Sequence, residues 1–180
     1  MSVDNKIILT PSVRNAPGNV SQETKDRLAD IFDGFVTNEA FALAVSQRLE
    51  VTEMSITPKV EEPRKVEAKV VIEVDVTSDM INGNGTLHGG CTAYLVDFCT
   101  SIAISLHSGY LGNWRRHVSS TLSVTYHAPA ALGSRIRIIN TTVAMGARAM
   151  TARAEIYDAT NKRLAATGTH VKMEPSGPKL

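Results

Sequence analysis

The sequence has little of what marks several large classes of protein. Aromatic residues make up 5% of its 180 residues, the formal net charge is +1, and there are two cysteines. The near-neutral charge argues against a strongly basic nucleic-acid-binding protein, and the apolar share of 43% argues against disorder. No apolar run approaches the roughly 20 residues that a membrane span needs. These absences predict one globular domain with no nucleic-acid or membrane partner.

The first residues and the cysteines bear on location. The opening stretch MSVDNKIILTPSVRN lacks the basic start and the long apolar segment of a secretory signal. Cys91 and Cys99 fall on one predicted helix, about 12 Å apart at about 1.5 Å per residue, which is too far for a disulfide. Both are expected to be thiols in a reducing compartment. We therefore expect a cytoplasmic protein, with a mitochondrial address left open.

Periodicity divides the chain into parts. Residues 1–20, which contain two prolines, are expected to be a flexible tail, and residues 176–180 a short C-terminal tail. Apolar residues at three- and four-residue steps predict a helical region over 21–49. Strands and one long helix are expected over 51–175, which completes a single domain over 21–175.

Alternation of apolar and polar residues predicts strands on both sides of an apolar helix. Val66 to Val76 alternate, and later segments do the same: HVSSTLSVTYHAP, SRIRIINTTVAM, AMTARAEIYD and RLAATGTHVKM. Between them, CTAYLVDFCTSIAISLH has no period of two and is apolar on most faces, as in a buried helix. Short connections favour antiparallel neighbours. The sequence thus predicts an α+β fold: an antiparallel sheet of about five strands wrapped around one long central helix, after an N-terminal helical extension.

Familiar catalytic and cofactor motifs are missing from the sequence. Gly83 and Gly85 begin a G-x-G-x-x-G pattern, but His88 takes the sixth position and no acid follows at the distance that a ribose needs. There is no G-x-x-x-x-G-K-[ST] phosphate loop and no G-x-S-x-G nucleophile elbow. The five histidines show no metal-ligand spacing. We therefore expect neither a metal nor a required cofactor.

The stretch NGNGTLHGGCTAYLVD places glycines directly before the apolar helix and one acid within it. Gly89 and Gly90 would leave amide groups of the first turn open to a ligand, and such groups can hold a carbonyl oxygen as it becomes negative. A glycine-rich turn without a ligand is the alternative. The burial cost of Asp97 predicts that it faces a cavity or another subunit. A carboxylate bonded to a backbone amide or an arginine is the alternative.

Charge is unevenly distributed along the chain. Between Asp97 and Glu155 there is no acid, whereas six arginines fall in this region. Two interpretations stay open: basic residues on the outer side of strands, or a site for a phosphorylated ligand. The six are Arg115, Arg116, Arg135, Arg137, Arg148 and Arg153.

The stretch NGNGTLHGGCTAYLVD, followed by VSSTLSVTYHAPAALG, resembles the PaaI-like acyl-CoA thioesterases of the hotdog superfamily, in which N-x-x-G-x-x-H-G-G and a later Asp open the central helix. The match is strong over residues 79–133, and the order of elements extends it over 21–175. The resemblance implies a five-stranded sheet curled around the helix, and homodimers with two shared sites that often pair into tetramers. It implies hydrolysis of acyl-CoA, with coenzyme A as part of the substrate. A noncatalytic acyl-CoA binding protein and an enoyl-thioester hydratase are the alternatives.

The same resemblance implies roles for single residues. Asn82 and the amide of Gly89 would polarise the thioester carbonyl, and His88 would fix the turn through hydrogen bonds. Asp97 of the partner subunit would act as general base on a water that Ser119 helps to hold, or else as a nucleophile. Coenzyme A would contact a strand end and a glycine bulge: Tyr126, His127, Ala128, Pro129, Met145, Gly146, Ala147 and Arg148.

Overall fold

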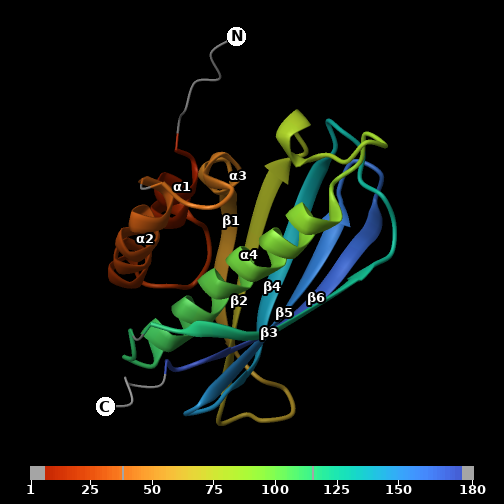
Figure 1. Ribbon diagram of the computed structural model, residues 1–180. Coiled ribbons are helices and arrows are strands. Elements are labelled where there is room, and N and C mark those ends of the chain that lie inside the picture. The colour runs from red at the N-terminus through yellow and green to blue at the C-terminus, as the bar shows by residue number, and fades with distance from the viewer. Residues whose placement is uncertain (1–6, 38, 115, 176–180) are drawn as a thin grey trace, which may run out of the picture.

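The computed structural model describes residues 7–37, 39–114 and 116–175. A long helix lies against the hollow side of a curved sheet, and three shorter helices lie beside them (Figure 1). In chain order the elements are α1 (Leu9–Asn15), α2 (Gln22–Thr37), α3 (Leu43–Gln47), β1 (Glu50–Pro58), β2 (Val66–Asp75), the 3-10 helix η1 (Ser78–Met80), α4 (Gly89–Tyr110), β3 (Val118–Tyr126), β4 (Arg135–Met145), β5 (Ala149–Asp158) and β6 (Arg163–Met173).

The strand order in the sheet is β1-β2-β4-β5-β6-β3, and all neighbouring pairs are antiparallel. The sheet wrapped around one helix is confirmed, with one strand more than the roughly five expected. Consecutive strands are not always neighbours, however. β3 pairs with β6 at the edge, whereas β4 lies between β2 and β5, because the connection 127–134 crosses the end of the sheet. β3 is therefore an edge strand with one side open.

The apolar character of α4 is explained by its place in the core. Alternate residues of the strands point toward the helix, as Ile136 and Ile138 do from β4, and both are fully buried. By length and composition alone α4 could cross a membrane, which corrects the expectation from apolar runs. Half of that window is buried inside the fold, and this burial accounts for its hydropathy.

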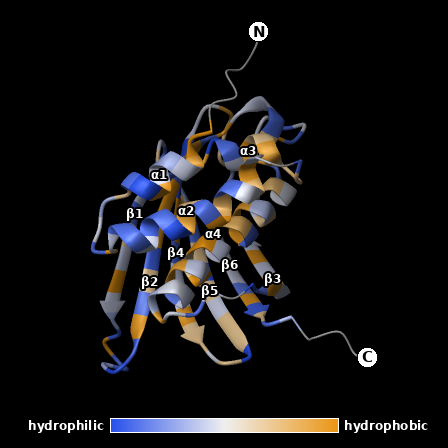
Figure 2. Cartoon of the chain, turned by 90° about the vertical axis from the view of Figure 1, so that its left-hand side faces the viewer, coloured by the Kyte–Doolittle hydropathy of each residue, from blue (hydrophilic) through white to orange (hydrophobic). Residues whose placement is uncertain are grey.

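Residues 7–20 are not the loose tail that their prolines suggested. Leu9 and Val13 belong to α1 and are fully buried, and α1 packs against α2 and β1. Pro11 is tolerated because it lies in the first turn of α1, where backbone N–H groups have no partner within the helix. In Figure 2, α1 and α2 turn largely hydrophilic surfaces outward. The rest of the two expected tails, 1–6 and 176–180, lies outside the described residues.

Candidate active site

α4 begins at a turn that one histidine holds in place. His88 is the N-cap residue, and its Nδ1 accepts a hydrogen bond from the amide of Gly90 (2.9 Å). Because an amide can only donate, Nδ1 is unprotonated and the ring proton of a neutral His88 lies on Nε2. The amide of Gly89 donates no hydrogen bond to any of the described residues. One donor at the positive end of the helix dipole is thus open to a ligand.

Asn82 lies beside this helix start because the chain turns back on itself. Ile81 and Leu87 form an antiparallel bridge, and the backbone N–H of Asn82 donates to the Thr86 carbonyl (2.8 Å). The Oδ1 atom of Asn82 accepts hydrogen bonds from the amide of Asn84 (2.9 Å) and from Thr86. Since the oxygen is occupied by the turn, the Nδ2 group is left to donate to a ligand.

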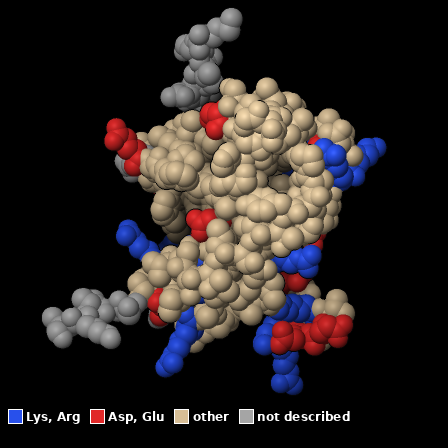
Figure 3. Space-filling model, turned by 45° about the vertical axis from the view of Figure 1, so that its right-hand side comes forward, with Lys and Arg blue, Asp and Glu red and all other residues tan. Residues whose placement is uncertain are grey.

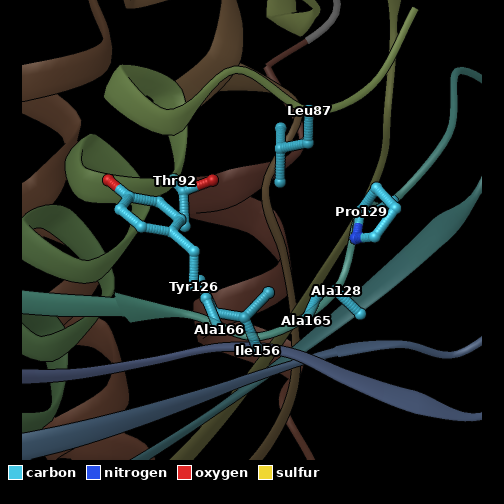
Figure 4. Close-up of a pocket in the computed structure, with 9 residues that line it drawn as sticks. Leu87, Thr92, Tyr126, Ala128, Pro129, Ile156, Ala165 and Ala166 are labelled. Carbon is cyan, nitrogen blue, oxygen red and sulfur yellow. The ribbon is translucent and has the colours of Figure 1, made fainter.

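The end of β3 is tied to the same turn. The hydroxyl of Tyr126 donates to the carbonyl oxygen of Gly89 (2.9 Å). Next to this bond lies a pocket of about 30 Å³, room for about one water molecule, which Ala128 and Pro129 also line (Figure 4). His127 turns to the strand instead, with Nε2 3.0 Å from the Thr167 hydroxyl. The strand end therefore fixes the position of the helix start.

A second polar cluster surrounds Asp97, which lies eight residues after Gly89 on α4. The Asp97 side chain is 42% exposed, on the open side of the helix. Its Oδ1 accepts a hydrogen bond from the Ser119 hydroxyl of β3 (2.9 Å) and lies 3.2 Å from Nε2 of His170. The structure thus brings together Asp97 and Ser119, which are far apart in the sequence, and leaves the carboxylate accessible.

His170 belongs to this cluster, and the sequence did not reveal it. The ring is fully buried on β6, with Nε2 2.9 Å from the Ser119 hydroxyl and Nδ1 2.7 Å from the Thr100 hydroxyl. Burial lowers the pKa of His170, as does Lys172, while Asp97 opposes the change. Nε2 of the ring faces Ser119 and Asp97, and Nδ1 faces the Thr100 hydroxyl, which itself donates to the Val96 carbonyl (2.6 Å). His170 therefore orients both Ser119 and Asp97.

The polar side chains of β6 carried a signal that could have identified this histidine. His170 and Lys172 have the same parity as Gly168, so both point toward α4 on the inner face of the sheet. Lys172 Nζ donates to the Ser101 hydroxyl (2.8 Å), and burial lowers its pKa while Asp97 opposes this. Two polar residues on the inner face of one strand are unusual, and this pair is the signal. Taken alone, however, a histidine at such a position is usually interpreted as a core residue.

The open donor at Gly89 and the Asp97 cluster are well separated along α4. Gly89 and Asp97 are eight residues apart on one helix, or about 12 Å at about 1.5 Å per residue. A catalytic base has to lie within about 3 Å of the proton that it removes, or one water further. Ser119, however, lies on the open edge strand, where every residue except Val124 is exposed. Such an edge is a template for pairing with a second chain.

The residues expected to contact coenzyme A lie at opposite ends of the sheet. Residues 126–129 begin with the last residue of β3, which pairs with Ala166, and 145–148 run from the last residue of β4 to the start of β5, near Met173. Along β5, Ala149 pairs with Met173 and Ile156 with Ala166, so the two ends are about 24 Å apart at about 3.4 Å per residue. One chain therefore does not join the two groups.

The expected glycine bulge is a hairpin turn. Gly146 lies between β4 and β5, and its amide donates to the Ala149 carbonyl (2.9 Å). The irregularity in the pairing of β4 with β5 falls earlier, between Thr142 and Ala144. Arg148 lies in the same turn, where its carbonyl accepts from the Glu174 amide (3.4 Å).

Three of the six arginines are neutralised by acids on neighbouring strand positions. Arg135 contacts three carboxylates of β1 and β2, Arg137 lies 3.7 Å from Glu73, and Arg153 lies 2.7 Å from Glu155. These contacts support the interpretation of outer strand positions for these three. In the view of Figure 3, Lys and Arg side chains stand around the rim of a largely uncharged surface.

The fold and the site together define a class of protein. A curled antiparallel sheet around one long helix is the hotdog fold. The glycine-rich start of that helix here offers an amide donor to a ligand. The sequence model described as "Thioesterase superfamily" matches residues 84–165. Mouse acyl-coenzyme A thioesterase 13 is 33% identical over 105 residues, which cover 58% of this chain and 71% of that protein. The chain belongs to the thioesterase superfamily, and it is a thioesterase.

Solved structures agree with this assignment. The zebrafish thioesterase superfamily member 2 is 29% identical, with a TM-score of 0.65, and the match covers 81% of this chain and 94% of that one. The phenylacetic acid degradation protein PaaI from Thermus thermophilus shares the fold, at 21% identity and a TM-score of 0.55. That match covers 71% of this chain and 93% of PaaI.

Proposed function

We propose that the protein hydrolyses acyl-CoA thioesters to a free carboxylic acid and coenzyme A at two sites shared across a homodimer. One observation carries the proposal: the Asp97–Ser119–His170 cluster lies on the same helix as the Gly89 amide, but about 12 Å from it. In a two-fold dimer, the helix start of each chain would meet the Asp97 cluster of the other, which completes two sites at once. The mouse relative named as an acyl-coenzyme A thioesterase supports the substrate class.

The chemistry follows from the groups in each half site. The Gly89 amide and Asn82 Nδ2 would donate to the thioester oxygen and stabilise the negative charge that develops there. Asp97 of the second chain would take a proton from a water molecule whose oxygen attacks the carbonyl carbon. When the carbon–sulfur bond breaks, the thiolate of coenzyme A would recover that proton from Asp97. His170 and Ser119 hold the carboxylate in place during these steps.

The open edge of β3 would supply the contact that such a dimer needs. If two β3 strands pair antiparallel about a two-fold axis, the Val118 end of one strand lies beside the Tyr126 end of the other. The turn 145–148 lies near the Val118 end through Met173. Pairing would therefore bring that turn of one chain toward residues 126–129 of the other. The expected coenzyme A contacts are thus compatible with a ligand bound across the dimer.

Thiol release by the purified protein tests the activity. A panel of acyl-CoAs should give free thiol with stoichiometric carboxylic acid. Tight binding of the same compounds without thiol release would instead indicate a noncatalytic binding protein. Addition of water to an enoyl-CoA without thiol release would indicate a hydratase.

Mixing two inactive variants tests the sharing of sites. Asn82→Ala and Asp97→Asn should each have little activity as homodimers. A mixed dimer has one site with both changes and one site with neither, so random mixing should restore about a quarter of the wild-type rate. If each site belonged to one chain, the mixture would stay as inactive as its components, and the shared-site proposal would be wrong.

A further inference from the structure

A continuous aromatic surface lies beside the proposed catalytic carboxylate, and no step of the proposed reaction uses it. Adjacent rings contact one another with centroid distances of 5.5 to 5.8 Å. Two of the rings come from α2, one from the α2–α3 connection and two from α4. We call this surface the aromatic shelf: Phe32, Phe35, Phe41, Tyr94 and Phe98.

The shelf is exposed where an apolar surface is costly. Phe32 is buried and anchors the cluster, whereas Phe35 is 55% exposed and Phe41 is 82% exposed. The chain also adopts an unfavourable conformation beside Phe41, since Ala42 has a φ of 54°, in the left-handed region that alanine rarely occupies. An exposed aromatic surface of this kind is typical of a binding site for an apolar group.

The shelf is continuous with the site. Tyr94 lies three residues before Asp97 on α4, and Phe98 directly follows it. Ser119 of β3 contacts Asp97 from the other side. The N-terminal helices pack on α4 and on β1, which is the edge opposite β3. Pairing of two chains through β3 would therefore leave the shelf uncovered. The shelf would then lie next to the thioester carbonyl group that the activated water attacks.

We propose that the aromatic shelf binds the apolar part of the acyl group, so that the preferred substrates are CoA thioesters of long alkyl or aryl acids. The inference rests on the proposed function, because it assigns a substrate class to the same site. Phe41 and Phe35 determine the specificity, since they carry the exposed apolar surface. Covering one phenyl side chain corresponds to about a ten- to hundredfold gain in affinity.

Substitution of Phe41 by alanine, with a series of substrates from acetyl-CoA to palmitoyl-CoA and with benzoyl-CoA, tests the proposal. For dodecanoyl-CoA we expect kcat/KM to fall about tenfold, and for acetyl-CoA to stay within about threefold of the wild type. Phe41→Leu should keep most of the long-chain activity. Tyr110→Ala is the matched control, because Tyr110 is likewise an exposed aromatic residue (55%) but lies at the far end of α4, and it should leave the chain-length profile unchanged.

Three outcomes would overturn the proposal. An equal loss on all substrates would indicate a structural role for Phe41, and an unchanged profile would show that the shelf does not contact the acyl group. Dissociation of the dimer by Phe41→Ala in analytical ultracentrifugation would indicate a partner contact instead.

Failure of the proposed function would give a different result from failure of the shelf proposal. In that case the wild type would release no thiol from any acyl-CoA. The shelf would then be tested by calorimetry with a dodecyl-CoA thioether, whose affinity should still fall about tenfold in Phe41→Ala. Equal affinity of the two proteins for the thioether would reject the shelf as a binding site for the chain.

Discussion

Replacement of Asp97 by asparagine separates the chemical role of the carboxylate from its structural role. Asparagine has the same shape, and its Oδ1 can still accept the hydrogen bond from Ser119 that Asp97 accepts at 2.9 Å. It cannot take a proton from water. General base catalysis contributes about 10² to 10⁴ in rate, so kcat should fall by that factor, or by about 2.7 to 5.5 kcal/mol in activation free energy.

The structure predicts little loss of stability for the same variant. The side chain is 42% exposed, and a hydrogen bond to a charged group exceeds a neutral one by about 1 kcal/mol before solvent screening. Thiol release under saturating acyl-CoA measures kcat, and urea unfolding measures stability. Asp75→Asn, at a 64% exposed acid on β2, is the control and should leave kcat unchanged. A kcat within about threefold of the wild type in Asp97→Asn would refute the role of this carboxylate as base.

Three further predictions concern the contact between α4 and the inner face of the sheet. A Cβ at Gly168 would lie 2.5 Å from Cγ1 of Val96. Gly168→Ala should therefore lower the free energy of unfolding, measured in urea, by about 1 to 3 kcal/mol. Gly34→Ala on α2 is the control and should not lower it, because an added Cβ there would have nothing within 4 Å. Burial and the nearby charge of Lys59 lower the pKa of His107 below 6.5. The unfolded state therefore binds more protons than the folded state, and the free energy of unfolding should fall as the pH drops through 6.5. His107→Gln should reduce this dependence of stability on pH. His170→Gln should lower kcat about tenfold without changing KM, because the ring positions the base; an equal rise in KM would contradict this.

Much of the fold could be predicted because its periodicities are local. The alternation from Val66 to Val76 and the unbroken apolar character of α4 predicted a half-buried strand and a core helix. The place of β3 could not be predicted, since strand order depends on where the 127–134 connection crosses the sheet. α1 was missed because the burial of Leu9 and Val13 comes from packing against α2 and β1, which no local pattern reports.

The candidate site divides in the same way. The sequence by itself determined the turn from Asn82 to Gly89, because glycines, a capping histidine and a helix start interact with near neighbours in the chain. The distance between Gly89 and Asp97 was also determined, since a helix has a fixed rise per residue. Only the tertiary structure decided that His170 meets Asp97, because strand pairing sets which distant residues share a face. It also decided that the N-terminal segment lies over α4, since that contact depends on packing between elements that the sequence does not relate.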